Sequence, residues 1–232
     1  MSRRLVAMAA AHLLIMMRRR AALLALVALP LAFYGALYRH SAHAITVGGI
    51  ASAFSAGGAA IFSMAPARDA DRRLVLAGYR PWELLAGRLV PLWAGSLVIS
   101  GVTATVMIAG TNPAHPGYVL AGVAAVGGIA VPLGLALGAV LPRELEATLV
   151  LIGCVGIQLT ARTDSAVAKF LPFHAAGQLL DASTGTVTGI GSRAALTAIY
   201  GAGLLAIALG SAAQRVRTRG KIALPGGPNV RR

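Results

Sequence analysis

The sequence predicts an all-α integral membrane protein with six transmembrane helices, an N-terminal interfacial amphipathic helix and both termini in the cytoplasm. Apolar residues make up 57% of the chain and charged residues only 12%, and the mean hydropathy is +0.74, whereas a soluble domain carries about 25% charged residues. The apolar residues gather in runs close to the roughly 20 residues that a helix needs to cross a bilayer. Clusters of basic residues flank these runs, which accounts for the net charge of +14 without a nucleic-acid partner.

The N-terminal segment, residues 1–20, holds an apolar run at 5–17 between Arg3 and Arg4 on one side and the arginines at 18–20 on the other. This run is too short to span a bilayer. It has the length of the apolar part of a signal peptide, but arginines stand where small residues would form the cleavage site. We therefore expect an uncleaved helix in the cytoplasmic interface, with its apolar face in lipid and its arginines near anionic headgroups.

Six apolar segments follow and are predicted to be transmembrane helices. Their approximate ranges are 21–38, 44–65, 89–110, 118–141, 147–160 and 190–211. The second is rich in glycine, alanine and serine, which let helices approach closely in lipid, so we expect it to be buried among other helices. The fifth is short for a crossing, which leaves its boundaries open. Residues 21–211 thus form the transmembrane domain, and 212–232 form a basic cytoplasmic tail.

The distribution of lysine and arginine predicts the orientation, because these residues concentrate in cytoplasmic loops. With the N-terminus inside, the cytoplasmic side takes all the basic residues except Arg39, Arg162, Lys169 and Arg193. Lys169 and Lys221 are the only lysines, and this preference for arginine, together with abundant alanine, is typical of a bacterium with a GC-rich genome. We expect a multi-pass protein of the bacterial cell (inner) membrane.

The most charged part of the chain is the segment 66–88, a predicted cytoplasmic loop between the second and third spans. Asp69 and Asp71 precede several arginines, an order that favours a helix start because carboxylates then lie at the positive end of the helix dipole. Gly78 can end this helix, and Pro81 can open the next one at its first turn. We expect a short amphipathic helix on the membrane surface, a bend and a re-entry into the third span. A solvated loop that only carries orienting charge is the alternative.

The segment 161–189 is too polar to cross the bilayer and too patterned for a simple loop. Its central sequence FLPFHAAGQLL is interrupted by Pro172, so we expect two short helical pieces that dip into the outer leaflet. Pro172, Phe173 and Gln178 are the candidate residues of this outer re-entrant segment.

The chain offers little material for chemistry of its own. The charged loop has only Asp69 and Asp71, whereas a CDP-alcohol phosphotransferase needs several spaced aspartates to hold divalent cations. No carboxylate lies within the six predicted spans, which argues against a proton or sodium relay. His40 and His43 could share a metal at the outer surface, but the histidines form no metal-binding motif, and the phosphate-binding patterns GxxxxGKS and GxxxxGKT are missing. We expect no catalytic, cofactor or metal site in this chain.

This architecture and two degenerate motifs resemble the permease subunits of type-2 ATP-binding-cassette exporters. Members of that family often show a loop of the form xERExxxLxxLxxxPxxxxxLxxGKLL at this position. In this sequence Arg68 to Arg73 take the charged part, Leu74 and Leu76 the apolar part, Tyr79 to Pro81 the bend, and Leu84, Leu85, Gly87 and Arg88 the return. The acidic position of the pattern is matched only loosely, by Asp69 or Asp71. The sequence FLPFHAAGQLLDA is similar to the family's outer segment before the last helix.

The resemblance implies a transport subunit and not an enzyme. Two permease copies, identical or related, would pair with two cytoplasmic ATPases that bind ATP and Mg²⁺, and residues 68–83 would sit in a cleft of the ATPase. The residues implied in this ATPase coupling are Arg68, Asp69, Asp71, Arg72, Arg73, Gly78, Arg80, Pro81 and Glu83.

Few fixed charges lie in the predicted spans, which favours a hydrophobic or amphiphilic substrate, such as a drug, an antibiotic or a lipid, over a sugar or a metal ion. The sequence singles out no substrate-binding residue. A small polytopic membrane scaffold or assembly factor without an ATPase partner is the alternative function, and in that case the arginines would only set the orientation.

Overall fold

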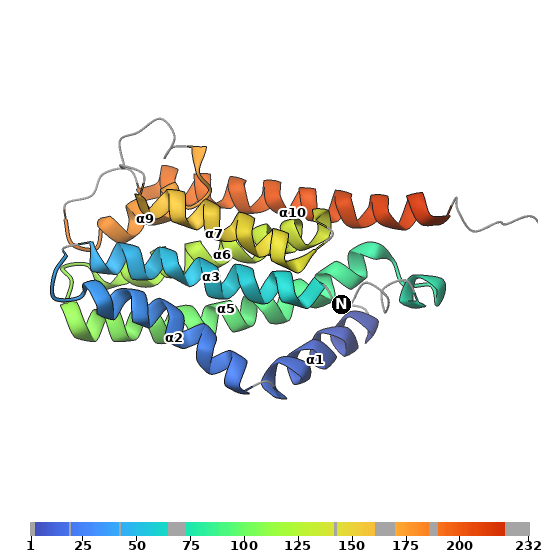
Figure 1. The fold of residues 1–232 in the computed structure, drawn as a ribbon, viewed down its shortest axis with the longest axis horizontal. Coiled ribbons are helices and arrows are strands. Elements are labelled where there is room, and N and C mark those ends of the chain that lie inside the picture. The colour runs from blue at the N-terminus through green and yellow to red at the C-terminus, as the bar shows by residue number, and fades with distance from the viewer. Residues whose placement is uncertain are drawn as a thin grey trace, which may run out of the picture.

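The computed structural model describes residues 3–18, 20–41, 43–64, 73–141, 143–160, 170–185 and 190–220 (Figure 1). These ranges are almost entirely helical and contain no β-strand. With the labels of Figure 1, the helices are α1 (Arg3–Arg18), α2 (Arg20–Leu37), α3 (Ala44–Met64), α5 (Pro81–Thr111), α6 (Pro116–Val140), α7 (Glu144–Thr160), α9 (His174–Asp181) and α10 (Ile190–Gly220).

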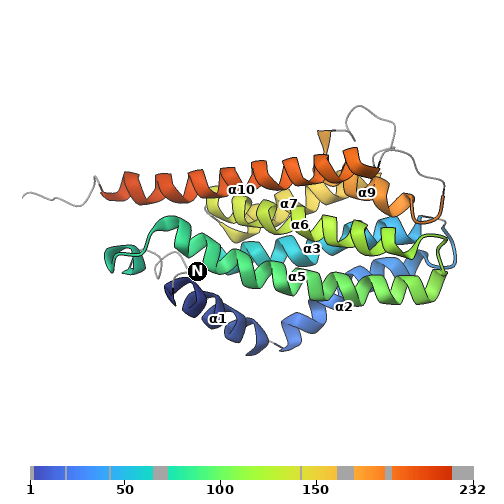
Figure 2. The ribbon, with the colours of Figure 1, turned by 180° about the vertical axis from the view of Figure 1, so that it is seen from behind.

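The long helices run side by side along the long axis of the molecule, and α3 and α6 lie at the centre (Figures 1 and 2). The short helix α9 lies at one end of this bundle, which we call the α9 end. The turn at residues 77–80 lies at the other, which we call the bend end. Helix α1 slants away from the bundle and meets α2 at an angle (Figure 2). The two ends of the bundle therefore differ: one carries the short helix α9, and the other carries the turn at residues 77–80.

The central pair of helices is held together by a close backbone approach. A Cβ atom added to Gly134 of α6 would lie 2.2 Å from the carbonyl oxygen of Gly57 in α3, so neither a methyl group nor a longer side chain fits there. Most of the α3 side chains are buried, and so are most of those in α6. This burial agrees with the expectation from the small residues of the segment 44–65, because such residues permit the tight packing that joins helices in lipid.

Among the residues that the structure describes, three helical stretches are long and apolar enough to cross a membrane: Ala44–Met64, Trp82–Thr111 and Pro116–Val140. Shorter apolar stretches lie at Leu24–Leu37 and Ala195–Ser211. Large apolar side chains also stand exposed along the outside of the bundle, among them Leu97, Val98, Leu149, Ile199 and Ile207. A water-soluble protein rarely exposes so many together. The helices are compatible with a membrane protein. Each of the six segments expected to cross coincides with a helix of the described chain, and three of these helices are long and apolar enough for a crossing.

Helix α5 begins at Pro81, the residue predicted to open it, and so ahead of the predicted third span. The third span was expected from about residue 89, but the helix starts at Pro81 and continues for 31 residues to Thr111. Pro91 lies within it and does not end it, since a helix packed against neighbours tolerates a missing N–H group. The predicted re-entry sequence is thus the first part of one continuous helix.

Candidate functional site

The turn before α5 is a defined helix-ending motif. Residues 73–76 form one helical turn. The amide of Tyr79 donates to the carbonyl of Leu74 and the amide of Gly78 to that of Val75, both at 3.0 Å. This pair of bonds is the Schellman arrangement, in which the penultimate residue adopts a left-handed conformation that glycine enters without steric cost. Gly78 has a φ of +89°, as that arrangement requires. The prediction that Gly78 ends this helix is confirmed.

The start of α5 is equally defined. Arg80 is extended, with φ −81° and ψ 143°, and Pro81 is the first residue of the helix. The Glu83 carboxylate accepts a hydrogen bond of 2.9 Å from the amide of Arg80. Proline at the first helical position and an acidic side chain two residues later both favour a helix start. The bend therefore joins two helical segments, one ended by the Schellman bonds and the other started by Pro81 and Glu83.

The surface of the bend carries both charged and apolar side chains. Arg73 and Arg80 are exposed, Leu76 is 82% exposed, and Trp82 is about half exposed. Of the residues implied in ATPase coupling, the structure describes Arg73, Gly78, Arg80, Pro81 and Glu83. The others, Arg68, Asp69, Asp71 and Arg72, lie outside the described residues, as does most of the predicted amphipathic helix.

Arg88 differs from Arg73 and Arg80, the other described arginines of the charged stretch, because it is buried, with 2% of its surface exposed. Its guanidinium Nη1 lies 3.3 Å from Sδ of Met64, the last residue of α3. A cation next to the carboxyl end of a helix is favoured by the helix dipole. Arg88 thus links the start of α5 to the end of α3. The sequence did not indicate this role, because Arg88 belongs to a charged stretch that reads as solvated.

The outer re-entrant segment is represented by α9 and the turn before it. Phe173 is fully buried, and the amide of Gly177 donates to its carbonyl oxygen at 2.8 Å. Pro172 lies in the turn before α9, and the structure thus has a helix after Pro172, as expected. Most of the piece expected before Pro172 falls in residues 161–169, outside the described chain. The Gln178 amide donates to Nε2 of His174 at 2.9 Å, one turn earlier on the same helix.

Helix α9 is inserted between α3 and α6. A Cβ atom on Gly49 of α3 would lie 2.5 Å from Cδ1 of Leu180, and one on Gly122 of α6 would lie 2.7 Å from Cγ of the same side chain. Leu180 itself is fully buried. The two glycines therefore form a seat that fits this leucine, and this seat holds α9 against the centre of the bundle.

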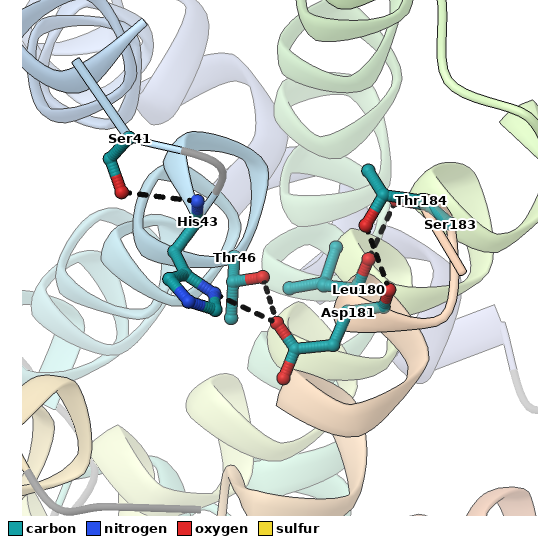
Figure 3. A network of polar contacts seen from close by, with 7 residues as sticks. All are labelled: Ser41, His43, Thr46, Leu180, Asp181, Ser183 and Thr184. Atoms are coloured by element: carbon teal, nitrogen blue, oxygen red, sulfur yellow. Dashed lines mark hydrogen bonds and ion pairs between the residues drawn. The ribbon is translucent and has the colours of Figure 1, made fainter.

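A polar network fastens the end of α9 (Figure 3). The hydroxyl of Thr46 donates to Oδ1 of Asp181 at 2.5 Å, and Nδ1 of His43 lies 3.8 Å from the same oxygen. The amide of His115, in the connection between α5 and α6, donates to the carbonyl of Ser183 at 3.0 Å. Asp181 lies at the carboxyl end of its own helix, where the dipole disfavours a carboxylate, but close to the amino end of α3, where the dipole favours one.

Asp181 was missed by the sequence reasoning, which singled out Pro172, Phe173 and Gln178. A signal was present, because Asp181 is the acidic residue of the quoted segment FLPFHAAGQLLDA. The idea that His40 and His43 share a metal finds no third ligand: the described side chains contain no group of three histidine, cysteine or acidic residues that could hold a metal ion.

Polar side chains also lie between the long helices. Ser96, Ser100 and Thr103 of α5 are buried, and the hydroxyl of Ser100 donates to the carbonyl of Val123 in α6 at 3.3 Å. Gln158 of α7 is 7% exposed. Within the described chain, no hydrogen-bond partner is found for Oγ1 of Thr103 or for Oε1 of Gln158. Buried polar atoms of this kind are costly in a membrane and often mark functional positions.

Neither a scan against models of protein families nor a search of the curated proteins gave a match to this chain.

Proposed function

We propose that this chain is the membrane-spanning permease subunit of an ATP-binding-cassette exporter. One observation carries the proposal: the capped bend at Gly78 and Arg80 leads directly into α5, a helix of 31 residues that runs along the bundle. A force applied to the bend would be transmitted along this helix without an intervening flexible joint. A surface loop that served only to orient the protein would need no such connection.

The bend offers the groups that a protein partner would bind. Arg73 and Arg80 can form charge-assisted hydrogen bonds with acidic side chains, and the exposed Leu76 and Trp82 can fill apolar pockets. The proposed partner is a cytoplasmic ATP-binding-cassette ATPase that binds ATP and Mg²⁺. A second copy of this permease, or a related permease, would complete the transporter.

The proposed orientation places the bend end in the cytoplasm. The excess of arginine in the predicted cytoplasmic segments supports it, because the positive-inside rule counts such residues close to the spans. The same count favours six crossings of the bacterial inner membrane, with both termini in the cytoplasm. The α9 end would then face outward, and α9 would close the outer part of the path.

The proposed substrate is a hydrophobic or amphiphilic compound, such as a drug, an antibiotic or a lipid. The polar groups between the described long helices are mainly hydroxyls and the Gln158 amide, and these suit an occasional hydrogen bond better than the full hydration shell of a sugar. The route of the substrate is proposed to pass near Thr103 or Gln158, because Oγ1 of Thr103 and Oε1 of Gln158 are buried without a hydrogen-bond partner in the described chain.

Charge reversal at the bend tests the proposal. We expect the double variant Arg73→Glu and Arg80→Glu to insert normally but to bind the copurifying ATPase about tenfold more weakly or worse, and to lose ATP-dependent export of a hydrophobic dye. The control is Arg143→Glu, which reverses an arginine whose side chain is 82% exposed in a different connection. Purification without any ATPase, or unchanged export in the double variant, would contradict the proposal; the first result would favour the membrane scaffold.

A further inference from the structure

Helix α1 presents an apolar outer surface with basic ends. Ala7, Ala10, Ala11 and Leu14 are exposed and recur at the spacing that places them on one helix face. Leu14 is 61% exposed. Charged residues are confined to the two ends of the segment: Arg3 and Arg4 precede the apolar run, and the arginines at 18–20 follow it. Water is a poor environment for such a face, whereas the boundary between acyl chains and headgroups suits both parts.

The inner face of α1 contacts the beginning of α5. Met8 is half-buried, and a Cβ atom on Gly87 would lie 3.0 Å from Cβ of Met8. The next residue along α5 is the buried Arg88, which reaches Met64 at the end of α3. Gly87 also follows Arg80 by two helical turns, so α1 touches α5 just beyond the bend. The position of α1 is therefore mechanically connected to both helices that flank the charged stretch.

We propose that α1 forms a docking surface for anionic lipid headgroups, and that bound headgroups fix the start of α5 and with it the bend. Charge complementarity identifies the occupant, because arginines gather at both ends of an apolar helix that slants out of the bundle (Figure 2). Bound lipid would fix the position of α1, and the contact of Met8 with Gly87 would then fix the start of α5. The bend, which precedes α5, would keep one position. The effect on transport rests on the proposed function; the lipid response itself does not.

Distance measurements between spin labels test the inference in the full-length chain. Labels are placed at Leu14→Cys on α1 and at Leu76→Cys before the bend, in a Cys154→Ala background that removes the native cysteine. The protein is reconstituted in vesicles of phosphatidylcholine alone, or with about a third of phosphatidylglycerol. We expect a broad distance distribution in the neutral vesicles and a narrow one in the anionic vesicles. Identical distributions in the two lipids would overturn the inference.

Removing charge separates α1 from other basic segments. Each basic residue near an anionic surface raises the affinity for that surface about fivefold. We therefore expect the triple variant Arg18→Gln, Arg19→Gln and Arg20→Gln to lose affinity for the anionic vesicles on the order of a hundredfold. We expect it to show no narrowing. The matched control replaces Arg215, Arg217 and Arg219 near the end of α10 with glutamine, and it keeps the narrowing. An equal loss in both triple variants would assign the effect to net charge and reject a surface on α1.

The contact between the two helices is tested on α5. We expect Gly87→Val to displace α1 and to abolish the narrowing, whereas Gly101→Val, on the same helix but with open space around it, keeps it. A full response in Gly87→Val would overturn the mechanical link. A measurement on the labelled protein itself needs no further variant to fold. In about 1 M salt, where the Debye length is about 3 Å, we expect the narrowing of its distance distribution to be reduced. An unchanged response at high salt would reject charge as its cause.

These experiments contain neither an ATPase nor a transported compound. Failure of the lipid response would leave the proposed transport function standing. Failure to find an ATPase would leave the lipid response standing.

Discussion

Thr46, in the first turn of α3, donates a 2.5 Å hydrogen bond to Asp181, the last residue of α9, across 135 positions of sequence. The carboxylate lies at the amino end of a helix to which it does not belong, with His43 3.8 Å away. The seat for Leu180 and this polar contact are two of the interactions that secure α9. They differ in kind and can be broken separately.

Loss of the polar contact is expected to free α9 without unfolding the bundle. Thr46→Val removes the donor and keeps the shape of the side chain, and a hydrogen bond to a charged group is worth about 1.5–3 kcal/mol. Because the Asp181 side chain is 35% exposed, we expect the lower part of that range, or about tenfold faster hydrogen exchange in α9. The control is Thr105→Val, whose hydroxyl bonds only its own helix. Unchanged exchange in Thr46→Val would show that the contact does not hold α9.

Packing between α3 and α6 should be sensitive to a single methyl group. Gly134→Ala places Cβ against the backbone oxygen of Gly57, which cannot move away as a flexible side chain could. We expect a loss of about 1–3 kcal/mol, measured as earlier thermal unfolding in detergent.

Gly128→Ala on the same helix is the control for this substitution, because nothing lies within 4 Å of its added Cβ atom. It should be neutral or slightly stabilising, since alanine is a better helix former than glycine. If both variants unfolded alike, the close approach of the two backbones would be refuted.

The geometry of the bend is expected to depend on Gly78. Gly78→Ala forces a side chain into a left-handed conformation at a cost of about 1–2 kcal/mol. The helical turn at residues 73–76 should open, and the amide of Tyr79, which bonds Leu74, should exchange faster. Ala77→Ser, one residue earlier, is the control. Equal exchange at Tyr79 in Gly78→Ala and in the unsubstituted protein would count against a conformation fixed by this glycine.

Accessibility to a membrane-impermeant thiol reagent tests the orientation. Single cysteines at Ala114, between α5 and α6, and at Arg143, before α7, both occupy exposed turns at opposite ends of the bundle. The native Cys154 is replaced in both variants. In intact cells we expect the reagent to label the cysteine at position 114 but not the one at position 143. After the membrane is permeabilised, both cysteines should be labelled. The reverse pattern would place the bend end outside and remove the ATPase from reach.

Local signals allowed the bend to be predicted. Gly78 and Pro81 act within a few residues of their own positions, so a helix end and a helix start can be recognised from sequence alone. The helical class and the membrane environment follow from composition for a similar reason, since they depend on long apolar segments and not on any one contact. Pro81 does start α5, as predicted, but the predicted span began only at residue 89, because the charged residues before it were assigned to the loop.

Contacts across the chain could not be predicted in the same way. The fit of Leu180 between Gly49 and Gly122 requires three segments to be placed in space, and the sequence gives no pairing among its many glycines. Arg88 reads locally as one more arginine of a charged stretch, and only its neighbour at the end of α3 explains its burial. Asp181 becomes significant only once Thr46 is beside it.

The contact at Gly57 and Gly134 constrains how the molecule can move. With no room for a methyl group between the two backbones, α3 and α6 cannot slide past each other without a collision, so they travel as one rigid pair. A transport cycle of the proposed kind would therefore open along the interfaces around this pair, with α3 and α6 moving together.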